Sequence, residues 1–254
     1  MTVSTGQLRV GVVGANGRMG TQAGQAISAA GDLALVATIG STDPLSQLTD
    51  SDTQVAVELT RPDAVMATVE YCISSGIHCV VGTSGVGDEQ LDAIRGLLDS
   101  AEGIGVIVVP NFAIGAVLAI RFARQAAAYF DGVEVIEMHH SGKVDAPSGT
   151  AITTARQIAQ ARAEAGAPAM PDATSRAVDG ARGADIDGVR VHSVRLPGLV
   201  AHQQVLLGND GELLTIRHDS MHRGSFMPGL LLAVRAISNR PGLTVGLEPL
   251  LDTG

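Results

Sequence analysis

Short, unbroken apolar runs alternate with longer stretches of helical periodicity through the first 110 residues. Strands that are buried on both faces read as continuous apolar runs, so this rhythm predicts a parallel sheet covered by helices on both sides. The expected strands are residues 8–13, 33–39, 55–59, 78–81 and 105–109. The expected helices are residues 18–30, 63–75 and 88–100.

The pattern changes after Pro110. The next expected elements are a helix over 115–130, a strand over 133–138, a helix over 150–165, and strands over 189–195, 202–207 and 212–218. Turn residues between the last strands predict a second, more antiparallel sheet. Residues 167–188 are rich in Pro, Gly, Ala and Asp, which predicts a surface loop. A final helix over 226–237 is expected to return to the first domain.

Composition and charge narrow the class of protein. The 254 residues can form one large domain or two modest ones. A net charge of −9 argues against nucleic acid or an anionic membrane as a partner. The first residues lack a signal-peptide layout, and no apolar run has the length of a membrane span, so the cytoplasm is the expected location. Cys72 and Cys79 have no metal-binding spacing and are expected to be buried thiols.

A glycine-rich turn, GANGRMG, follows the first expected strand and opens the first helix. Gly14, Gly17 and Gly20 would allow a tight turn and let backbone N–H groups approach a pyrophosphate, with Arg18 as a further cation. The spacing is GxxGxxG rather than GxGxxG, and a glycine-rich turn without a ligand is the alternative. The other strand ends are also candidate ligand contacts, because open parallel sheets bind ligands beyond the carboxyl ends of their strands.

The end of the second strand does not settle which dinucleotide would bind. An acid that holds the ribose 2′-hydroxyl usually stands there. This chain has Gly40 at that position, the first acid is Asp43, and no basic residue is present to accept a 2′-phosphate. The sequence therefore leaves the choice between NADH and NADPH open.

The segment EMHHSGKVDAPSGT, residues 137–150, concentrates polar chemistry. Neighbouring side chains of a strand point to opposite faces, so His139 and His140 are not expected to share a metal ion, and no metal site is expected. Lys143 is the one lysine among 17 basic residues. Arginine keeps its proton, whereas a lysine can transfer one, which favours an acid catalyst over the chance placement of a surface cation.

The end of this segment offers an anion site. Gly149 lets the backbone come close to a ligand, and the N–H groups of the helix start can hold a carboxylate. In the alternative interpretation, Ser148 or Thr150 simply caps the helix. Glu137 shares a strand face with the first histidine and either orients it or forms a structural salt bridge. Asp145 is expected to hold the loop through backbone amides.

Two further residues bracket the segment LPGLVA and are low-priority candidates for the same pocket, Arg195 and His202. The histidines at positions 192, 202, 218 and 222 are scattered along the chain. We interpret them as structural or solvent-facing.

EMHHSGKVDAPSGTA closely resembles the signature of the 4-hydroxy-tetrahydrodipicolinate reductase family, which serves lysine and diaminopimelate synthesis. The resemblance covers nearly the whole chain, through GANGRMG, GTSG at Gly82, VPNFAIG at Val109, RLPGLVAHQ and SFMPG. It implies an α/β fold with a Rossmann-like parallel-sheet cofactor domain over 1–113 and 223–254. Residues 114–222 would form a smaller α+β domain with a mixed or antiparallel sheet, which binds substrate and forms a homotetramer.

The resemblance also implies an activity and the residues that carry it. NADH or NADPH would reduce a cyclic, small dicarboxylate substrate. His139 and Lys143 match the catalytic positions, and His140, Gly149 and Thr150 match substrate positions. The cofactor positions fall on Gly14, Ala15, Asn16, Gly17, Arg18, Met19, Gly82, Thr83, Ser84, Val109, Pro110, Asn111 and Phe112. Positive charge at His139 and Lys143 would stabilise charge that builds on the substrate.

The chain departs from the family pattern at three places. Gly40 replaces the usual acid, Glu58-Leu59-Thr60 stands where Asp-Phe-Thr is common, and Ser84 replaces the second Thr of GTT. Two rival functions are another small Rossmann dehydrogenase, such as one that acts on a semialdehyde, and a protein that senses NAD(P)H without catalysis. The His139–Lys143 segment favours the reductase over both.

Overall fold

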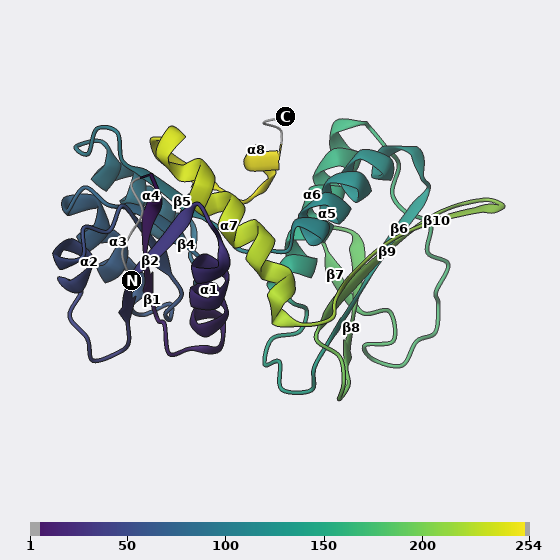
Figure 1. Cartoon of the computed structure of the whole chain (residues 1–254). Coiled ribbons are helices and arrows are strands. Elements are labelled where there is room, and N and C mark those ends of the chain that lie inside the picture. The colour runs from purple at the N-terminus through teal and green to yellow at the C-terminus, as the bar shows by residue number, and fades with distance from the viewer. Residues whose placement is uncertain (1–5, 252–254) are drawn as a thin grey trace. The chain divides into compact units, whose positions relative to one another are not determined.

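The structure is a computed structural model that describes residues 6–251 (Figure 1). The chain divides into two compact units. The first comprises Met1–Ile114 and Arg223–Gly254, and the second comprises Gly115–His222. Each unit has its own sheet and its own hydrophobic core.

The first unit is built on a six-stranded sheet with the order β11-β5-β4-β3-β1-β2. Its strands are β1 (Leu8–Val13), β2 (Leu33–Ile39), β3 (Val55–Glu58), β4 (His78–Val81), β5 (Gly105–Val108) and β11 (Gly242–Val245). Every neighbouring pair is parallel, as the continuous apolar runs predict. The five expected strands are confirmed to within one residue, whereas the edge strand β11 was not expected.

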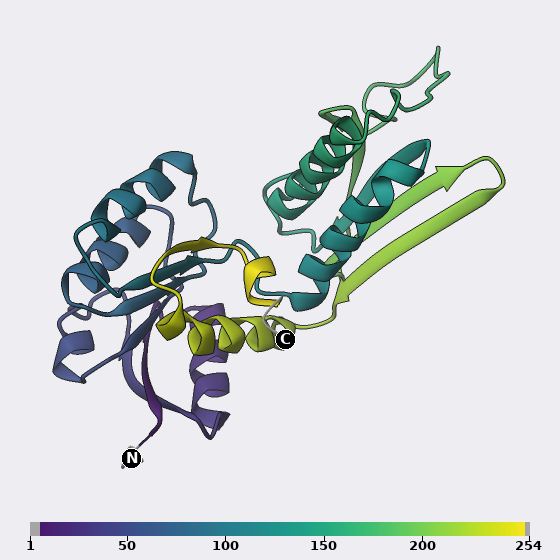
Figure 2. The same cartoon turned by 90° about the horizontal axis from the view of Figure 1, so that it is seen from above.

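Helices cover both faces of this sheet. They are α1 (Arg18–Ala29), α2 (Gln47–Asp50), α3 (Val65–Ser74), α4 (Asp88–Leu98), α7 (Met227–Ala236) and the short α8 (Glu248–Leu251). Leu48, Cys72 and Ile94 bring α2, α3 and α4 into one core cluster with the sheet. Figures 1 and 2 show α1 and α7 on the opposite face.

The order of the strands creates a site for ligands. The chain leaves β1 for the edge strand β2 and then returns across β1 to β3. Open parallel sheets bind ligands at such a reversal, beyond the carboxyl ends of the two strands that flank it. In this chain the flanking ends are Gly14, after β1, and Leu59, after β3.

The second unit has a five-stranded mixed sheet with the order β10-β9-β6-β8-β7. Its strands are β6 (Gly132–His139), β7 (Ala184–Ile186), β8 (Val189–Arg195), β9 (Ala201–Asn209) and β10 (Glu212–Ser220). The central pair β6 and β8 is parallel, and the other pairs are antiparallel. The prediction of a surface loop over residues 167–188 is wrong at its C-terminal end, because β7 pairs there with β8.

Helices α5 (Ile114–Ala126) and α6 (Gly149–Glu164) pack on one face of this sheet (Figure 2). The expected helix over 115–130 ends early and continues as a 3₁₀ turn, Ala127–Tyr129. Alternate residues of β6, including Val133 and Val135, join both helices in the core. The described residues contribute no helix to the other face of the sheet in either view (Figures 1 and 2).

The structure also bears on the two cysteines and on membrane-spanning helices. Cys72 and Cys79 are free thiols and both are buried, as expected. Within residues 6–251, no helix is long and apolar enough to cross a membrane.

Candidate active site

The glycine turn lies at the reversal of strand order. Gly14 has a φ of +81°, and a Cβ atom there would collide with the carbonyl oxygen of Leu59. A Cβ atom on Gly20 would likewise collide with the carbonyl of Gly14. The N–H groups of Gly14 and Ala15 donate to the carbonyl of Ile39 over 2.8 and 3.0 Å. The turn is therefore packed against the ends of β2 and β3, which only glycine at these positions permits.

The start of α1 suits an anion. Gly17 is its N-cap and supplies no side-chain cap, and the first turn contains no acid. The first N–H groups of such a helix lack intrahelical partners and carry partial positive charge. Arg18 adds an exposed cation in the same turn. A pyrophosphate would satisfy these groups.

The ends of β3, β4 and β5 meet at a second group of predicted cofactor residues. A Cβ atom on Gly82 would lie 2.6 Å from Leu59 Cδ2 and would also collide with the Phe112 ring. The N–H of Val109 donates to the carbonyl of Val81 over 2.8 Å, which ties β5 to β4 at this edge. Thr83 Oγ1 is buried and has no hydrogen-bond partner among the described residues. A buried hydroxyl without a partner next to a glycine cradle fits a polar ligand.

In the second unit, β6 places Glu137 and His139 on the same face of the sheet. The Nδ1 atom of His139 lies 2.5 Å from Glu137 Oε2, and the Glu137 side chain is completely buried. A carboxylate accepts hydrogen bonds, so Nδ1 carries the proton and Nε2 is the atom left for another partner. Glu137 therefore orients His139, which was the first of the two expected roles.

Glu137 also forms the expected salt bridge. Arg195 donates to both of its carboxylate oxygens over 2.8 and 2.7 Å. The backbone N–H of Ser148 donates to Glu137 Oε1 over 3.1 Å. Burial alone would raise the pKa of Glu137, but the hydrogen bonds from Arg195 and His139 outweigh it and hold that pKa below its usual range. One buried carboxylate thus connects β6, β8 and the start of α6.

The charge of His139 differs from the expectation. Burial lowers the pKa of His139 below its usual range, and the hydrogen bond to Glu137 offsets only part of this effect. The lowered pKa favours the neutral imidazole near neutral pH and does not support the expected positive charge on it. The cations near His139 are Lys143, in the same segment, and Arg195, at the end of β8.

Lys143 lies in the loop that follows β6. Its Nζ atom is 2.7 Å from Asp145 Oδ1, and its side chain is 22% exposed. The hydrogen bond from Lys143 holds the pKa of Asp145 below its usual range, and backbone N–H groups act in the same direction. Asp145 therefore binds backbone amides, as expected, and also pairs with Lys143, which was not expected. Arg195 donates to the carbonyl of Asp145 over 2.6 Å and fixes the loop on β8.

The helix start after this loop resolves the capping alternatives. Ser148 is the N-cap of α6, and its Oγ accepts from the N–H of Ala151 over 3.2 Å. The first turn of α6 has no acid. A Cβ atom on Gly149 would meet no atom within 4 Å, so there is open space in front of this backbone. His140, Gly149 and Thr150 all border the loop that carries Lys143.

The two low-priority candidates, Arg195 and His202, have different partners. Arg195 contacts the Glu137 carboxylate, whereas His202 binds Asp219 over 2.7 Å and accepts from the N–H of Val200. His192 binds Glu134 over 2.7 Å, which is the structural role expected for it. Within the described part of the chain, no cluster of His, Cys, Asp and Glu residues is suited to a metal ion.

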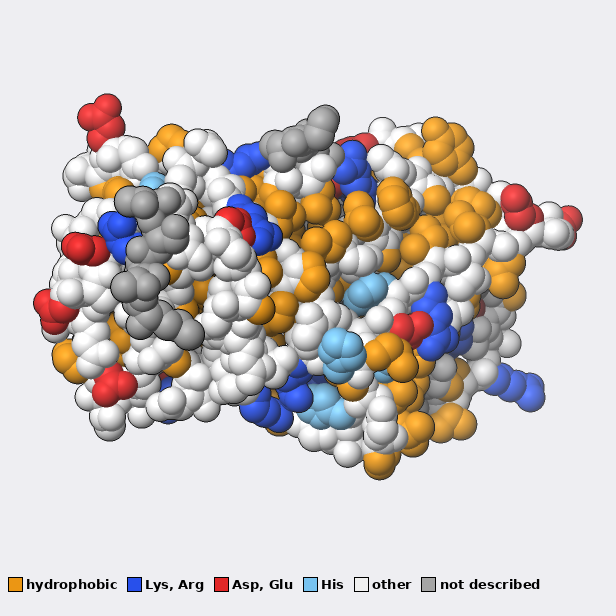
Figure 3. Space-filling view, viewed as in Figure 1, with side chains coloured by type: hydrophobic (Ala, Val, Ile, Leu, Met, Phe, Trp, Pro, Cys, Tyr) orange, Lys and Arg blue, Asp and Glu red, His pale blue; other side chains and the backbone are white. Residues whose placement is uncertain are grey.

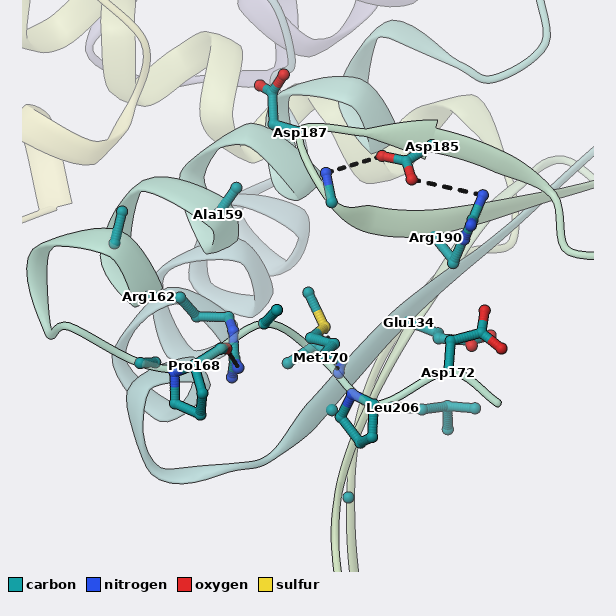
Figure 4. Close-up of a pocket in the computed structure, with 18 of the residues that line it drawn as sticks. Glu134, Ala159, Arg162, Pro168, Met170, Asp172, Asp185, Asp187, Arg190 and Leu206 are labelled. Atoms are coloured by element: carbon teal, nitrogen blue, oxygen red, sulfur yellow. Dashed lines mark hydrogen bonds and ion pairs between the residues drawn. The ribbon is translucent and has the colours of Figure 1, made fainter. Parts of the chain in front are cut away.

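A cavity of about 650 Å³ in the second unit lies apart from these residues (Figure 4). None of the predicted site residues lines it. Its cations are engaged: Arg162 donates to backbone carbonyls, and Arg182 pairs with Glu134 over 2.5 Å. Figure 4 shows Asp185 reaching Arg190, at 3.5 Å. The cavity therefore offers an anion no unpaired cation.

A glycine turn at a reversal of strand order, together with a second unit that carries a His, a Lys and an open helix start, fits a two-domain oxidoreductase that uses a nicotinamide dinucleotide. The protein-family model for the N-terminus of dihydrodipicolinate reductase matches residues 8–112, and the family model for its C-terminus matches residues 115–251. The chain belongs to the dihydrodipicolinate reductase family.

Individual relatives agree with this placement. The chain is 58% identical to the 4-hydroxy-tetrahydrodipicolinate reductase of Streptomyces griseus, over 97% of this chain and 98% of that protein. It is also 58% identical to the reductase of Nocardia farcinica, over 96% and 99% of the two chains.

Solved structures of other proteins share the fold of this chain. A dipicolinate-bound dihydrodipicolinate reductase from Paenisporosarcina sp. TG-14 aligns with a TM-score of 0.83 at 39% identity, over 96% of this chain and 99% of that one. A scyllo-inositol dehydrogenase from Lactobacillus casei aligns with a TM-score of 0.62 at 10% identity, over 98% and 93% of the two chains, which shows a shared fold alone.

Proposed function

We propose that this protein reduces the dehydrated form of 4-hydroxy-tetrahydrodipicolinate to tetrahydrodipicolinate, with NADH or NADPH as the reductant. The observation that carries the proposal is the loop of residues 140–148. It holds Lys143 between His139 and the start of α6, and it is fixed by the buried Glu137. The names of the relatives supply the substrate, a small dicarboxylate.

The first unit would hold the dinucleotide. The open N-terminus of α1 and Arg18 would bind the pyrophosphate. The segments 82–84 and 109–112 would contact the nicotinamide end, where the Thr83 hydroxyl lacks a partner. Leu59 fills the place next to Gly82 where the family often has an aromatic ring. When bound, NADH or NADPH supplies the hydride that adds to the ring.

The second unit would hold the substrate and complete the reduction. Lys143 Nζ donates the proton that, with the hydride, saturates one double bond of the ring. Its positive charge also stabilises negative charge on the substrate before the proton is transferred. Neutral His139 contributes Nε2 as a hydrogen-bonding group rather than a charge. His140 and the N–H groups at Gly149 and Thr150 bind a carboxylate.

We also propose that the protein is a cytoplasmic homotetramer and that the second unit makes the contacts between copies. Within residues 6–251, all of the large exposed hydrophobic side chains except Val245 lie in this unit. Tyr129 is 80% exposed and Leu213 is 66% exposed. Figure 3 shows hydrophobic side chains grouped on the second unit. Exposed apolar surface of this kind favours association between copies. The test is the molar mass in solution, measured by light scattering.

The activity is tested by nicotinamide oxidation with substrate made in situ by the preceding synthase. We expect oxidation of NADH or NADPH that depends on that substrate. Binding of both dinucleotides without turnover would instead support a sensing protein. Turnover of a semialdehyde, but not of this substrate, would support a different dehydrogenase.

A further inference from the structure

The end of β2 lacks the carboxylate that usually holds the adenosine ribose, and the structure shows what fills its place. A Cβ atom on Gly40 would lie 2.5 Å from Asn16 Nδ2 and 3.2 Å from Asp43 Oδ2. The space beside the strand end is thus already occupied by an amide from the glycine turn and by a carboxylate from the following loop. A larger residue at position 40 would displace one or both of them.

The carboxylate of Asp43 is held in this position. The N–H of Gly40 donates to Asp43 Oδ2 over 2.8 Å, which turns the side chain back over the strand end. One carboxylate oxygen is used in this bond, and the other remains for a ligand. Asp43 is exposed, so a ligand can reach it.

This carboxylate lies next to the proposed dinucleotide site. The last residue of β2, Ile39, accepts hydrogen bonds from Gly14 and Ala15 in the glycine turn. Asn16 extends that turn to Gly40. The pyrophosphate-binding turn and the Asp43 carboxylate are therefore joined through consecutive contacts within one unit.

The loop that follows β2 carries an acid and no cation. Residues 41–46, Ser-Thr-Asp-Pro-Leu-Ser, contain no Lys or Arg. A ribose 2′-hydroxyl can donate to a carboxylate, whereas a 2′-phosphate carries negative charge and would be repelled by it. Arg18 is the nearby cation in sequence, and it lies in the first turn of α1, where a pyrophosphate is expected.

We propose that Asp43 replaces the missing strand-end acid, binds the adenosine ribose hydroxyls, and makes this protein select NADH over NADPH. The proposal rests on the proposed function, since it concerns the same dinucleotide site. It also accounts for Gly40: the glycine leaves the space that Asn16 and Asp43 occupy. Gly40 and Asp43 are thus a matched pair rather than a lost acid and an unrelated loop residue.

The test is the binding affinity of each reduced dinucleotide, measured by fluorescence titration with the full chain and without substrate. We expect the wild-type protein to bind NADH at least about tenfold more tightly than NADPH. Asp43→Asn keeps an oxygen that can accept from Gly40 but removes the charge. We expect it to bind NADPH more tightly than the wild type and to lower the preference for NADH by about tenfold.

Three controls separate this role from other effects. Asp92→Asn removes an exposed acid of the same unit that pairs with Arg95 on α4, and it should leave the preference unchanged. Arg18→Ala should weaken NADH and NADPH by the same factor, because a pyrophosphate contact is common to both. Asp43→Ala removes the bond to Gly40 as well and should weaken NADH more than Asp43→Asn does.

The results of these titrations test the role of Asp43 separately from the proposed reductase function. Tighter binding of NADPH by the wild type, or an unchanged preference in Asp43→Asn, overturns the role of Asp43 and leaves the reductase assignment intact. Selective loss of NADPH binding in Arg18→Ala would also overturn it, since Arg18 would then hold a 2′-phosphate. Failure of the wild type to bind either dinucleotide would overturn the proposed function itself, and the role of Asp43 with it.

Discussion

Glu137 and Arg195 are 58 residues apart in the chain, and they meet as a bidentate ion pair across the parallel strands β6 and β8. Both ends of the pair extend into the candidate site. Glu137 accepts a hydrogen bond from Nδ1 of His139. Arg195 donates to the main-chain carbonyl of Asp145, and the side-chain carboxylate of Asp145 pairs with Lys143. The proposed catalytic groups therefore have fixed positions because a buried carboxylate is neutralised by one arginine.

Removal of this charge should destabilise the second unit strongly. We expect Glu137→Gln to lower the free energy of unfolding by about 3–5 kcal/mol, because Arg195 would be left without its counter-charge in a largely buried place. Urea denaturation measures the change. Glu134→Gln is the matched control on the same strand, since its carboxylate pairs with Arg182 at 33% exposure. It should cost about 1 kcal/mol or less, and an equal loss in both variants would contradict the account.

The stability should depend on pH through His139. Its native pKa is lowered by burial from the ordinary value of 6.5, so the unfolded chain binds a proton at a pH where the native imidazole does not. The free energy of unfolding must therefore fall as the pH drops below 6.5 toward the native pKa. Glu137, whose pKa is lowered, keeps its contribution above its ordinary 4.5 and loses it only at more acid pH.

The variant His139→Gln isolates this effect. Urea unfolding at about pH 8 and about pH 5.5 should show a smaller loss of stability in the variant than in the wild type. His78 and His218 also have lowered pKa values, but they are present in both proteins and cancel in the comparison. Equal losses in the two proteins would show that His139 does not carry a lowered pKa.

The glycine turn should tolerate no side chain at its first position. Gly14→Ala combines a φ of +81° with a collision against the Leu59 carbonyl, so we expect a loss of about 1–3 kcal/mol in stability and of dinucleotide binding. Gly31→Ala is the control, because a Cβ atom there meets nothing within 4 Å. Thermal unfolding and NADH titration measure both effects. Normal binding by Gly14→Ala would remove the turn from the dinucleotide site.

Much of the fold is predictable because its strands are buried on both faces and read as apolar runs. The strand β11 could not be predicted in this way. Gly242–Val245 has only four residues, is largely half-exposed, follows Pro241 and pairs only with β5. The strand β7 could not be predicted for a similar reason, since Ala184–Ile186 becomes a strand only through its pairing with β8. Long-range pairing, which no local pattern reports, decides both elements.

The candidate site was predictable by residue type but not by connection. A lone lysine, adjacent histidines and a Ser-Gly-Thr helix start could be found by inspection of residues 137–150. The partnership of Glu137 with Arg195 depends on the register of two parallel strands, which the sequence does not state. The neutral state of His139 depends on burial, which a residue count does not reveal.

The central claim is that Lys143 supplies the proton. The most direct measurement is the turnover number of Lys143→Ala and Lys143→Arg with saturating dinucleotide and substrate. We expect both variants to bind NADH normally and to lose about 10²–10⁴ in turnover, because arginine keeps a positive charge near Asp145 but does not release its proton. Near-normal turnover in Lys143→Ala would contradict the claim, and near-normal turnover in Lys143→Arg alone would reduce Lys143 to a charge.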